Sequence, residues 1–501
     1  MNFNRMKLTS VNFSLFFALL LAGLLLPFML TNDSIWIDEG GTAMYAAQPD
    51  FHSWWHHLGQ DNTSDSEMPL TMFMAWIAAP VLGTAEWQMR AVNLLWGALA
   101  MVGMYRVGRR IQMPWLPLLL AIQPYFWFYM NEARPYALQI ACGTWLLAAF
   151  VEFIFAKAAG QTWAWLLAGS VFFLFLTTML APVTVAAVVL AGIIIAFLNR
   201  WKPERKALLV LLAGAVANLP AAIYYLTTLL RGAKGSQLWH VDLKFFGYVL
   251  YEFTGMTGLG LPTEEIRELA RSPHIVAALA AHWWAFALPV FGFVLVLAVI
   301  FFGLRRPLRF PSRLQIGLLI ILGLTAAIFV AGSLALQKAF WARHFAPVFP
   351  FYVILLGMAM TGAAGSSRRI IRVLPFLLCG LLMYSDMNLR FATAWRKENY
   401  RAAAQFARQS LAENKSIWWL AAPNCAIYYK LQTATNLPEL GKVFAPLAGF
   451  GNVDGLPLPD VIIYSKPDIN DPGLAVHNII TQSHYGEAIV LKSFTIWTNA
   501  P

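Results

Sequence analysis

Asn131-Glu132-Ala133-Arg134-Pro135-Tyr136-Ala137-Leu138 joins an acid and a base to the start of an apolar stretch that continues to about residue 156. A helix needs about 20 apolar residues to cross a bilayer, and this stretch is long enough. Charged side chains are expensive at the edge of a membrane, so this pair indicates a functional site. Pro135 suits the first turn of a helix, which makes Glu132 to Arg134 its extended lead-in.

The whole chain has the composition of a membrane protein with several spans. Its 501 residues are 59% hydrophobic and only 12% charged, and apolar runs of about 18 to 24 residues recur along it. The net charge of +11 comes from basic clusters between those runs. Basic residues gather in this way on the cytoplasmic side of membrane proteins, so we expect membrane lipids and no nucleic acid as partners.

The basic clusters predict about eleven spans, with the N-terminus in the cytoplasm of a bacterial inner membrane and the C-terminus in the periplasm. The expected spans are residues 13–30, 91–105, 112–130, 135–156, 162–179, 182–198, 207–228, 282–304, 314–336, 345–362 and 371–387. Residues 69–83 are also apolar. We expect them to lie along the outer surface, because a crossing there would place the cluster Arg106, Arg109 and Arg110 outside.

Three segments are then expected to face outward: a first loop over residues 31–90, a loop from about 229 to 282, and the C-terminal tail. The tail predicts an amphipathic helix over residues 400–411 and strands at 417–421, 461–464 and 488–497. The fold class is therefore mainly α: a polytopic membrane domain over residues 1–388, with a small extracytoplasmic α/β domain over 389–501.

On this topology, charged residues from three distant regions reach the outer side. They are Asp38 and Glu39 after the first span, Glu132 and Arg134 before the fourth, and Arg343 and His344 before the tenth. Helix N-termini favour anions, and the planar guanidinium group suits a phosphate. The sequence therefore predicts that Arg134, Arg343 and His344 bind the phosphate of a lipid.

The carboxylates suggest the other half of a reaction. Transfer of a sugar from a lipid phosphate to a hydroxyl needs a base, and Asp38 is the candidate. Glu39 and Glu132 are expected to orient the acceptor. A divalent cation, Mg²⁺ or Mn²⁺, held by Asp38 and Glu132 stays open, because hard cations prefer oxygen ligands, but the spacing does not demand one.

Purely structural roles are an alternative explanation for the same residues. Adjacent acids in a polar loop are commonly solvated, and arginines at an interface extend toward the headgroups. Tyr136 and its aromatic neighbours suit either an interfacial belt or contact with substrate.

Three motifs resemble the GT-C superfamily of integral-membrane glycosyltransferases. They are Trp-Ile-Asp-Glu at 36–39, Glu-Ala-Arg-Pro-Tyr-Ala-Leu at 132–138 and Arg-His-Phe-Ala-Pro-Val-Phe-Pro at 343–350. The similarity is greatest to the bacterial branch related to protein O-mannosyltransferases and the lipid A aminoarabinose transferase. It covers about residues 10–390, and Glu398-Asn399-Tyr400-Arg401 resembles the start of the outer domain of such proteins.

The resemblance implies a polyprenyl-phosphate-linked sugar donor, inversion at the anomeric carbon, a hexosyl or pentosyl group as cargo, and Asp38 as catalytic base. It also implies an extracytoplasmic acceptor, which is a glycolipid, a polysaccharide or a protein. One departure occurs at Asp65-Ser66-Glu67-Met68-Pro69-Leu70, where many relatives have His-Pro-Pro-Leu. Glu67 replaces the histidine, and we expect it to contact substrate together with Tyr136.

Two other classes compete with this interpretation. A transporter or lipid flippase predicts ionisable residues at mid-span and an internal repeat, and the chain has neither pattern. A membrane scaffold would use the outer tail to capture a partner and would carry no sugar chemistry.

Overall fold

The computed structural model describes residues 3–60, 63–230, 243–262, 265–266, 269, 277, 280–306, 310–337, 339–446, 456–471, 473–483 and 485–499. The chain divides into two compact units. The helical unit comprises residues 1–31, 58–71 and 90–395, and the α/β unit comprises residues 32–57, 72–89 and 396–501. Segments of the first outer loop thus belong to the same unit as the C-terminal tail.

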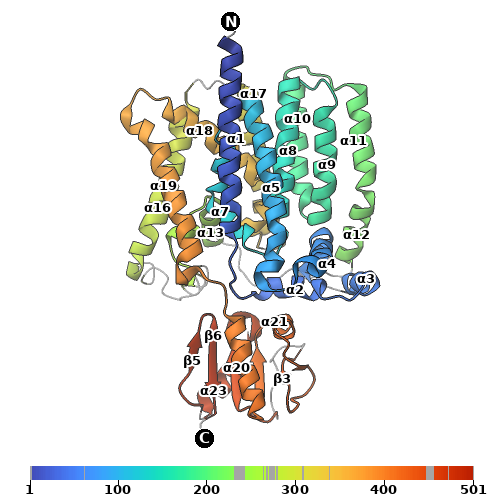
Figure 1. Ribbon diagram of the computed structural model, residues 1–501, viewed down its shortest axis with the longest axis vertical. Helices are drawn as coiled ribbons and strands as arrows, with labels where there is room; N and C mark the ends of the chain where they lie inside the picture. Colours follow the sequence, from blue (N-terminus) through green and yellow to red (C-terminus); the bar gives the residue numbers. More distant parts are fainter. Residues whose placement is uncertain are drawn as a thin grey trace. The chain divides into compact units, whose positions relative to one another are not determined.

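Helices make up most of the helical unit (Figure 1). The longer ones are α1 (Phe3–Met29), α5 (Glu86–Ile111), α8 (Tyr136–Ala156), α9 (Thr162–Thr177), α10 (Ala181–Leu198), α11 (Arg205–Ala217), α12 (Leu219–Leu230), α16 (Trp283–Leu304), α17 (Ser312–Leu336), α18 (Phe349–Ala364) and α19 (Arg369–Phe391). The shorter ones are α6 (Leu116–Ala121), α7 (Pro124–Met130) and α13 (Leu243–Phe253), with 3₁₀ turns η1 (Ser64–Glu67), η2 (Thr257–Leu259), η3 (Ala342–Phe345) and η4 (Thr393–Trp395).

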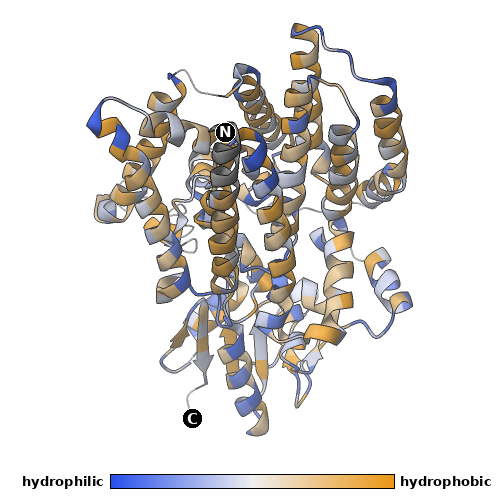
Figure 2. Ribbon diagram, turned by 45° about the horizontal axis from the view of Figure 1, so that its top comes forward, coloured by the Kyte–Doolittle hydropathy of each residue, from blue (hydrophilic) through white to orange (hydrophobic). Residues whose placement is uncertain are grey.

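Hydrophobic residues run along these helices, and hydrophilic residues concentrate at their ends (Figure 2). Among the described residues, seven helices are long and apolar enough to cross a membrane, and four apolar helices are shorter. The predicted polytopic, mainly helical class is confirmed. In the expected outer loop between 229 and 282, residues 231–242 and most of 263–279 lie outside the described residues, whereas α13 and η2 are described.

The structure corrects the expected span at residues 112–130, which is not one helix. Gln123 has extended backbone angles between α6 and α7, because the proline ring of Pro124 disfavours helical geometry in the residue before it. Both short helices are buried in the core of the helical unit. The expected start of a span at residue 345 is also early, because residues 342–345 form η3 and α18 begins at Phe349.

A glycine allows the segment before α18 to approach α8 closely. A Cβ added at Gly143 would lie 2.0 Å from the carbonyl oxygen of Pro347, far inside van der Waals contact. The backbone of the segment that follows Arg343 and His344 therefore rests directly on α8.

The α/β unit contains a six-stranded sheet in the order β2-β3-β1-β4-β6-β5. The strands are β1 (Ile417–Leu420), β2 (Thr433–Ala434), β3 (Val443–Phe444), β4 (Val461–Tyr464), β5 (Ile489–Leu491) and β6 (Phe494–Thr498). β1 runs parallel to β3 and β4, with Ile417 opposite Val443 and Val461, whereas β6 is antiparallel to β4. Helices α2 (Ile37–Ala46), α3 (Phe51–Gln60), α4 (Pro69–Leu82), α20 (Tyr400–Ala412), α21 (Pro423–Tyr428), α22 (Pro467–Asn470) and α23 (Ala475–Gln482) complete the fold.

The predicted amphipathic helix is confirmed as α20, whose face with Ala403 and Ala407 packs into a core with Trp419. The strands predicted at 417–421 and 461–464 are confirmed as β1 and β4. The single strand expected at 488–497 is wrong. It is a hairpin, β5 and β6, with a turn at Ser493, whose φ is 62°. The two-residue strands β2 and β3 carry too short a pattern to be predicted.

The apolar segment 69–83 forms α4, whose 14 residues are fewer than the roughly 20 that a bilayer requires. It packs against α3, where the ring centroid of Trp54 is 5.4 Å from that of Phe73. The indole N–H of Trp76 also donates a hydrogen bond to the carbonyl of Gln48, at 2.9 Å. Its place along the outer surface of the membrane stays a prediction.

Candidate active site

Side-chain amides tie the lead-in of α8 to other helices of the helical unit. Asn131 accepts a hydrogen bond from the N–H of Thr31 at 2.8 Å and donates one to the Thr31 hydroxyl at 3.1 Å. Asn93 of α5 donates to the carbonyl oxygens of Met130, at 3.0 Å, and Glu132, at 2.5 Å. The end of α1 and the start of α8 therefore lie at the same end of this unit, and Glu132 is buried there.

Arg134 makes a buried ion pair. Its Nη1 lies 2.5 Å from a carboxylate oxygen of Asp65, and its Nη2 lies 3.9 Å from the sulfur of Met68. Asp65 belongs to η1, whose Ser66 carbonyl accepts a hydrogen bond from Tyr224 at 2.7 Å. The guanidinium thus neutralises an acid that the sequence did not identify as its partner, and it fixes the turn that carries Glu67.

Glu67 ends η1 and is half-buried. Its carbonyl oxygen accepts the backbone N–H of Met179 at 3.2 Å. The expected substrate contact at this position therefore sits on a turn that is fixed by both Arg134 and the segment after α9.

Tyr136 lies in a cluster of buried tyrosines. Its ring centroid is 4.8 Å from that of Tyr129, which is 4.6 Å from that of Tyr125. The Tyr125 hydroxyl donates a hydrogen bond to the carbonyl of Ala342 at 2.7 Å. This cluster links the first turn of α8 to the residue before Arg343, two regions about 200 positions apart in sequence.

Arg343 and His344 are both half-buried in η3. Burial and the neighbouring positive charge of Arg343 lower the pKa of His344 to about 3. His344 is therefore neutral at physiological pH, and it offers a hydrogen bond rather than a charge. Its Nδ1 is buried and has no hydrogen-bond partner among the described residues.

Glu252 of α13 is a buried acid that the sequence analysis missed. Tyr129 donates a hydrogen bond to its carboxylate, and the charge of Arg343 acts on it. Burial raises the pKa of Glu252 to about 7. The available signal was an acid within the aromatic stretch Tyr248-Val249-Leu250-Tyr251-Glu252-Phe253.

The other acidic pair belongs to the α/β unit. Asp38 and Glu39 occupy the first turn of α2, where the helix dipole favours negative charge. Glu39 is fully buried, accepts the N–H of Trp36 at 3.4 Å and lies 3.1 Å from Nζ of Lys397. Asp38 is half-buried. Glu39 therefore anchors the turn, and Asp38 is the acid that remains accessible.

Residues of the C-terminal part surround this turn. A Cβ added at Gly40 would lie 2.8 Å from Sγ of Cys425 in α21, so α2 packs directly on α21. The Nζ atoms of Lys397 and Lys466 lie 5.8 Å and 5.5 Å from the ring centroid of Trp36, within the range of a cation–π interaction.

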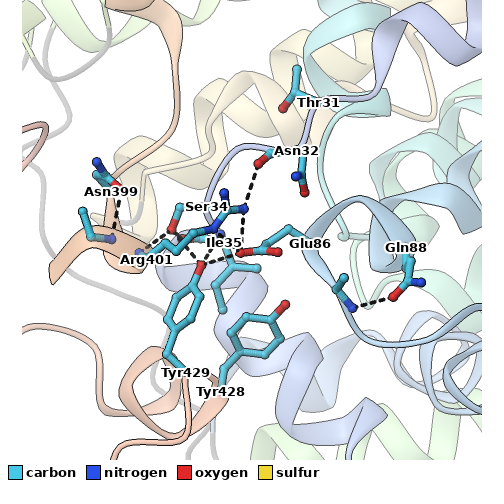
Figure 3. Close-up of polar contacts among 12 residues, drawn as sticks. Thr31, Asn32, Ser34, Ile35, Glu86, Gln88, Asn399, Arg401, Tyr428 and Tyr429 are labelled. Atoms are coloured by element: carbon cyan, nitrogen blue, oxygen red, sulfur yellow. Dashed lines mark hydrogen bonds and ion pairs between the residues drawn. The ribbon is translucent and has the colours of Figure 1, made fainter. Parts of the chain in front are cut away.

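Arg401 fixes the loop that leads to Asp38 (Figure 3). Its Nε donates to Glu86 at 2.9 Å, and its Nη2 donates to the carbonyl of Asn32 at 2.8 Å. Tyr429 points at the same carboxylate and donates to it at 2.9 Å, while its oxygen lies 2.9 Å from the Ser34 hydroxyl. The segment Glu398 to Arg401 thus holds the first outer loop.

The structure therefore distributes the expected site residues between the two units. The helical unit contains Glu67, Glu132, Arg134, Tyr136, Arg343 and His344, and the α/β unit contains Asp38 and Glu39. Across the described ranges, no three His, Cys, Asp or Glu side chains are grouped as a metal site requires. Asp38 and Glu132 belong to different units, and a divalent cation held by them stays a prediction.

No protein-family model matches the sequence, and no curated protein matches it either. The solved structures to which the chain is similar include several transferases. One is ArnT from Cupriavidus metallidurans bound to undecaprenyl phosphate, with a TM-score of 0.49, 12% identity and 97% of each chain covered.

Two further solved structures are similar to this chain, but the match covers a smaller share of their own length. The oligosaccharyltransferase of Archaeoglobus fulgidus in its apo form has a TM-score of 0.45 and 13% identity, covering 80% of this chain and 59% of that one. The arabinofuranosyltransferase AftD from Mycobacteria has a TM-score of 0.44 and 13% identity, covering 97% of this chain and 40% of that one. At such scores, the function has to be argued from the residues of this chain.

Proposed function

We propose that this chain is a membrane glycosyltransferase that moves one sugar from a polyprenyl-phosphate donor to an extracytoplasmic acceptor. The observation that carries the proposal is the gathering of buried ionisable groups at one end of an apolar helical unit. Glu132, the Arg134–Asp65 pair and Glu252 are all buried there. Charges at such a depth are expensive and are therefore typical of functional sites.

The phosphate of the donor is assigned to Arg343. Its guanidinium is half-buried, and neutral His344 beside it can donate a hydrogen bond. A leaving phosphate is already charged and needs cationic stabilisation more than protonation. Arg134 supports the same site through Asp65, because this ion pair holds η1 and Glu67 in place.

Asp38 is proposed as the general base that takes the proton of the acceptor hydroxyl while the configuration at the anomeric carbon of the sugar is inverted. Glu39 is fully buried beside Lys397, whereas Asp38 in the same turn is half-buried, so that part of its side chain is exposed.

Glu132 and Tyr136 complete the proposal as residues that contact the sugar or the acceptor. The acceptor class, whether glycolipid, polysaccharide or protein, and the choice between a hexosyl and a pentosyl group stay open. The basic clusters favour a bacterial inner membrane with the acidic turns in the periplasm.

Replacement of the base tests the proposal. Asp38→Asn removes the proton acceptor and is expected to lower transfer at least 100-fold, since general base catalysis contributes about 10²–10⁴-fold. Membrane insertion and melting temperature should change little, because the substitution is isosteric and Asp38 is only half-buried. Turnover of a radiolabelled polyprenyl-phosphate sugar in proteoliposomes measures this. Glu487→Gln, an exposed acid in the same unit, is the matched control. Full activity in Asp38→Asn refutes the base.

A further inference from the structure

A buried acid lies near Arg343, the residue proposed to bind the donor phosphate, and has no role in the reaction above. Glu252 in α13 is 6% exposed. Tyr129 of α7 donates a hydrogen bond to its carboxylate, and Tyr248, about one helical turn earlier in α13, makes a second. The positive charge of Arg343 in η3 acts on the same carboxylate. Three elements of the helical unit therefore converge on this side chain.

We propose that Glu252 sets the charge that Arg343 presents to a lipid phosphate, so that the phosphate binds together with a proton. This inference rests on the proposed function, in which Arg343 binds the donor. It makes Glu252 a positioning residue that acts through Arg343.

The two states of Glu252 act oppositely on an anion. Burial raises the pKa of Glu252 to about 7, although the Tyr129 bond, the charge of Arg343 and the Tyr248 bond all lower it. Both forms are therefore populated near neutral pH. The ionised form neutralises Arg343 and repels phosphate. The protonated form leaves the guanidinium charge to the ligand, so binding should weaken as the pH rises through about 7.

The phenols, the imidazole and the guanidinium around Glu252 do not change charge in this range. Tyr129 and Tyr248 are phenols, which are neutral near pH 7. The pKa of His344 is lowered to about 3, so it is neutral as well. Arg343 stays protonated. Glu132 acts on Tyr129 from the lead-in of α8. Among the described groups with a shifted pKa near this site, Glu252 is the one placed to titrate at neutral pH.

Donor affinity as a function of pH tests the inference. The probe is polyprenyl methyl phosphate, a diester that does not titrate near neutral pH, added to the full-length protein in detergent. We expect its Kd to rise about fivefold from about pH 6 to about pH 8, since a pKa coupling of about one unit gives a tenfold change only in its high-pH limit. Glu252→Gln should keep the tight binding of the lower pH at both values. Glu487→Gln should retain the pH dependence.

Three results overturn the inference. One is a wild-type Kd that is equal at both pH values, which leaves the phosphate site itself intact. The second is a Glu252→Gln protein with the full pH dependence. The third is binding absent at both pH values, which also removes the phosphate site of the proposed function.

A second variant keeps the test decisive if Glu252→Gln folds poorly. Tyr129→Phe removes a hydrogen bond that favours the carboxylate, so the midpoint of the pH dependence should move upward. A purely structural role of Tyr129 would weaken binding equally at every pH, and this result would contradict the inference. Calorimetry in buffers of different ionisation enthalpy should also detect proton uptake when the wild-type protein binds the probe. Binding of the probe without proton uptake would overturn the inference.

Discussion

Single residues in this chain are explained by their partners more than by their type. Arg134 illustrates this, because a guanidinium at the start of a span predicts an anion nearby, and the Asp65 carboxylate is such an anion. The sequence predicted a charged site at Glu132 and Arg134, and both are buried there. It could not predict the pairing with Asp65, because 69 positions separate the two side chains and no local pattern records their contact.

The Arg134–Asp65 pair predicts a large effect on stability. Arg134→Ala leaves a nearly buried carboxylate without its partner, which should destabilise the protein by about 3–5 kcal/mol. The double variant Arg134→Met with Asp65→Leu removes both charges and should recover most of the loss. Thermal unfolding in detergent measures both. If Arg134→Ala keeps the wild-type melting temperature and loses donor binding, Arg134 contacts the phosphate directly instead.

The segments that contain the site residues are held by close backbone packing against neighbouring helices. The segment 342–348 lies on α8 at Gly143, and α2 lies on α21 at Gly40. Hydrophobic periodicity predicts these helices well, because each must bury an apolar face or cross a bilayer. It does not predict which glycine marks a crossing, since Gly169, with nothing within 4 Å of an added Cβ, looks the same in sequence.

Gly143→Ala therefore tests the support beneath Arg343. The added methyl must displace the carbonyl of Pro347, at a cost of about 1–3 kcal/mol. We expect the KM for the donor to rise, because the displaced segment carries Arg343. Gly169→Ala in α9 is the control. It should leave KM unchanged and stabilise slightly, by up to about 1 kcal/mol. Equal kinetics in the two variants would show that the segment is not held by this contact.

Lys397 is expected to position the acidic turn of α2. Lys397→Met removes the ammonium group beside the fully buried Glu39 carboxylate, which should destabilise the α/β unit by about 3–5 kcal/mol and lower kcat. Lys397→Arg keeps the charge and should restore part of both. The donor KM should not change, since the residues assigned to the donor lie in the helical unit. Lys442→Met, which removes a surface pair with Glu439, should cost at most about 1 kcal/mol. A raised donor KM in Lys397→Met would argue against a positioning role.

At the scale of the whole molecule, the sequence predicted a membrane domain and an outer α/β domain. It could not predict that residues 32–57 and 72–89 join the latter unit. The contacts responsible are tertiary: Ile35 packs in one core with Tyr400 and Trp419, and Glu86 accepts bonds from Arg401 and Tyr429. None of these contacts can be recognised from the sequence of the segment that makes it.

Truncation after residue 395 tests this interleaving. The remaining chain keeps Asp38 but loses the strands and helices against which α2 packs. We expect normal insertion of the helical unit, rapid proteolysis within residues 32–57, and no transfer. The full-length chain, treated with protease under the same conditions, is the reference. A truncated protein that still transfers sugar would show that the acidic turn is positioned without the tail.

The interleaved α/β unit also bears on biosynthesis. Chains are made from the N-terminus, and domains fold as units when their parts are available. The turn with Asp38 emerges early, yet Lys397, Arg401 and Cys425, which hold it and its loop, are translated last. A nascent chain is therefore expected to leave Asp38, the proposed base, without these supports until residues 397–425 have been translated. Synthesis that stops before them is expected to give an inserted protein without transfer activity.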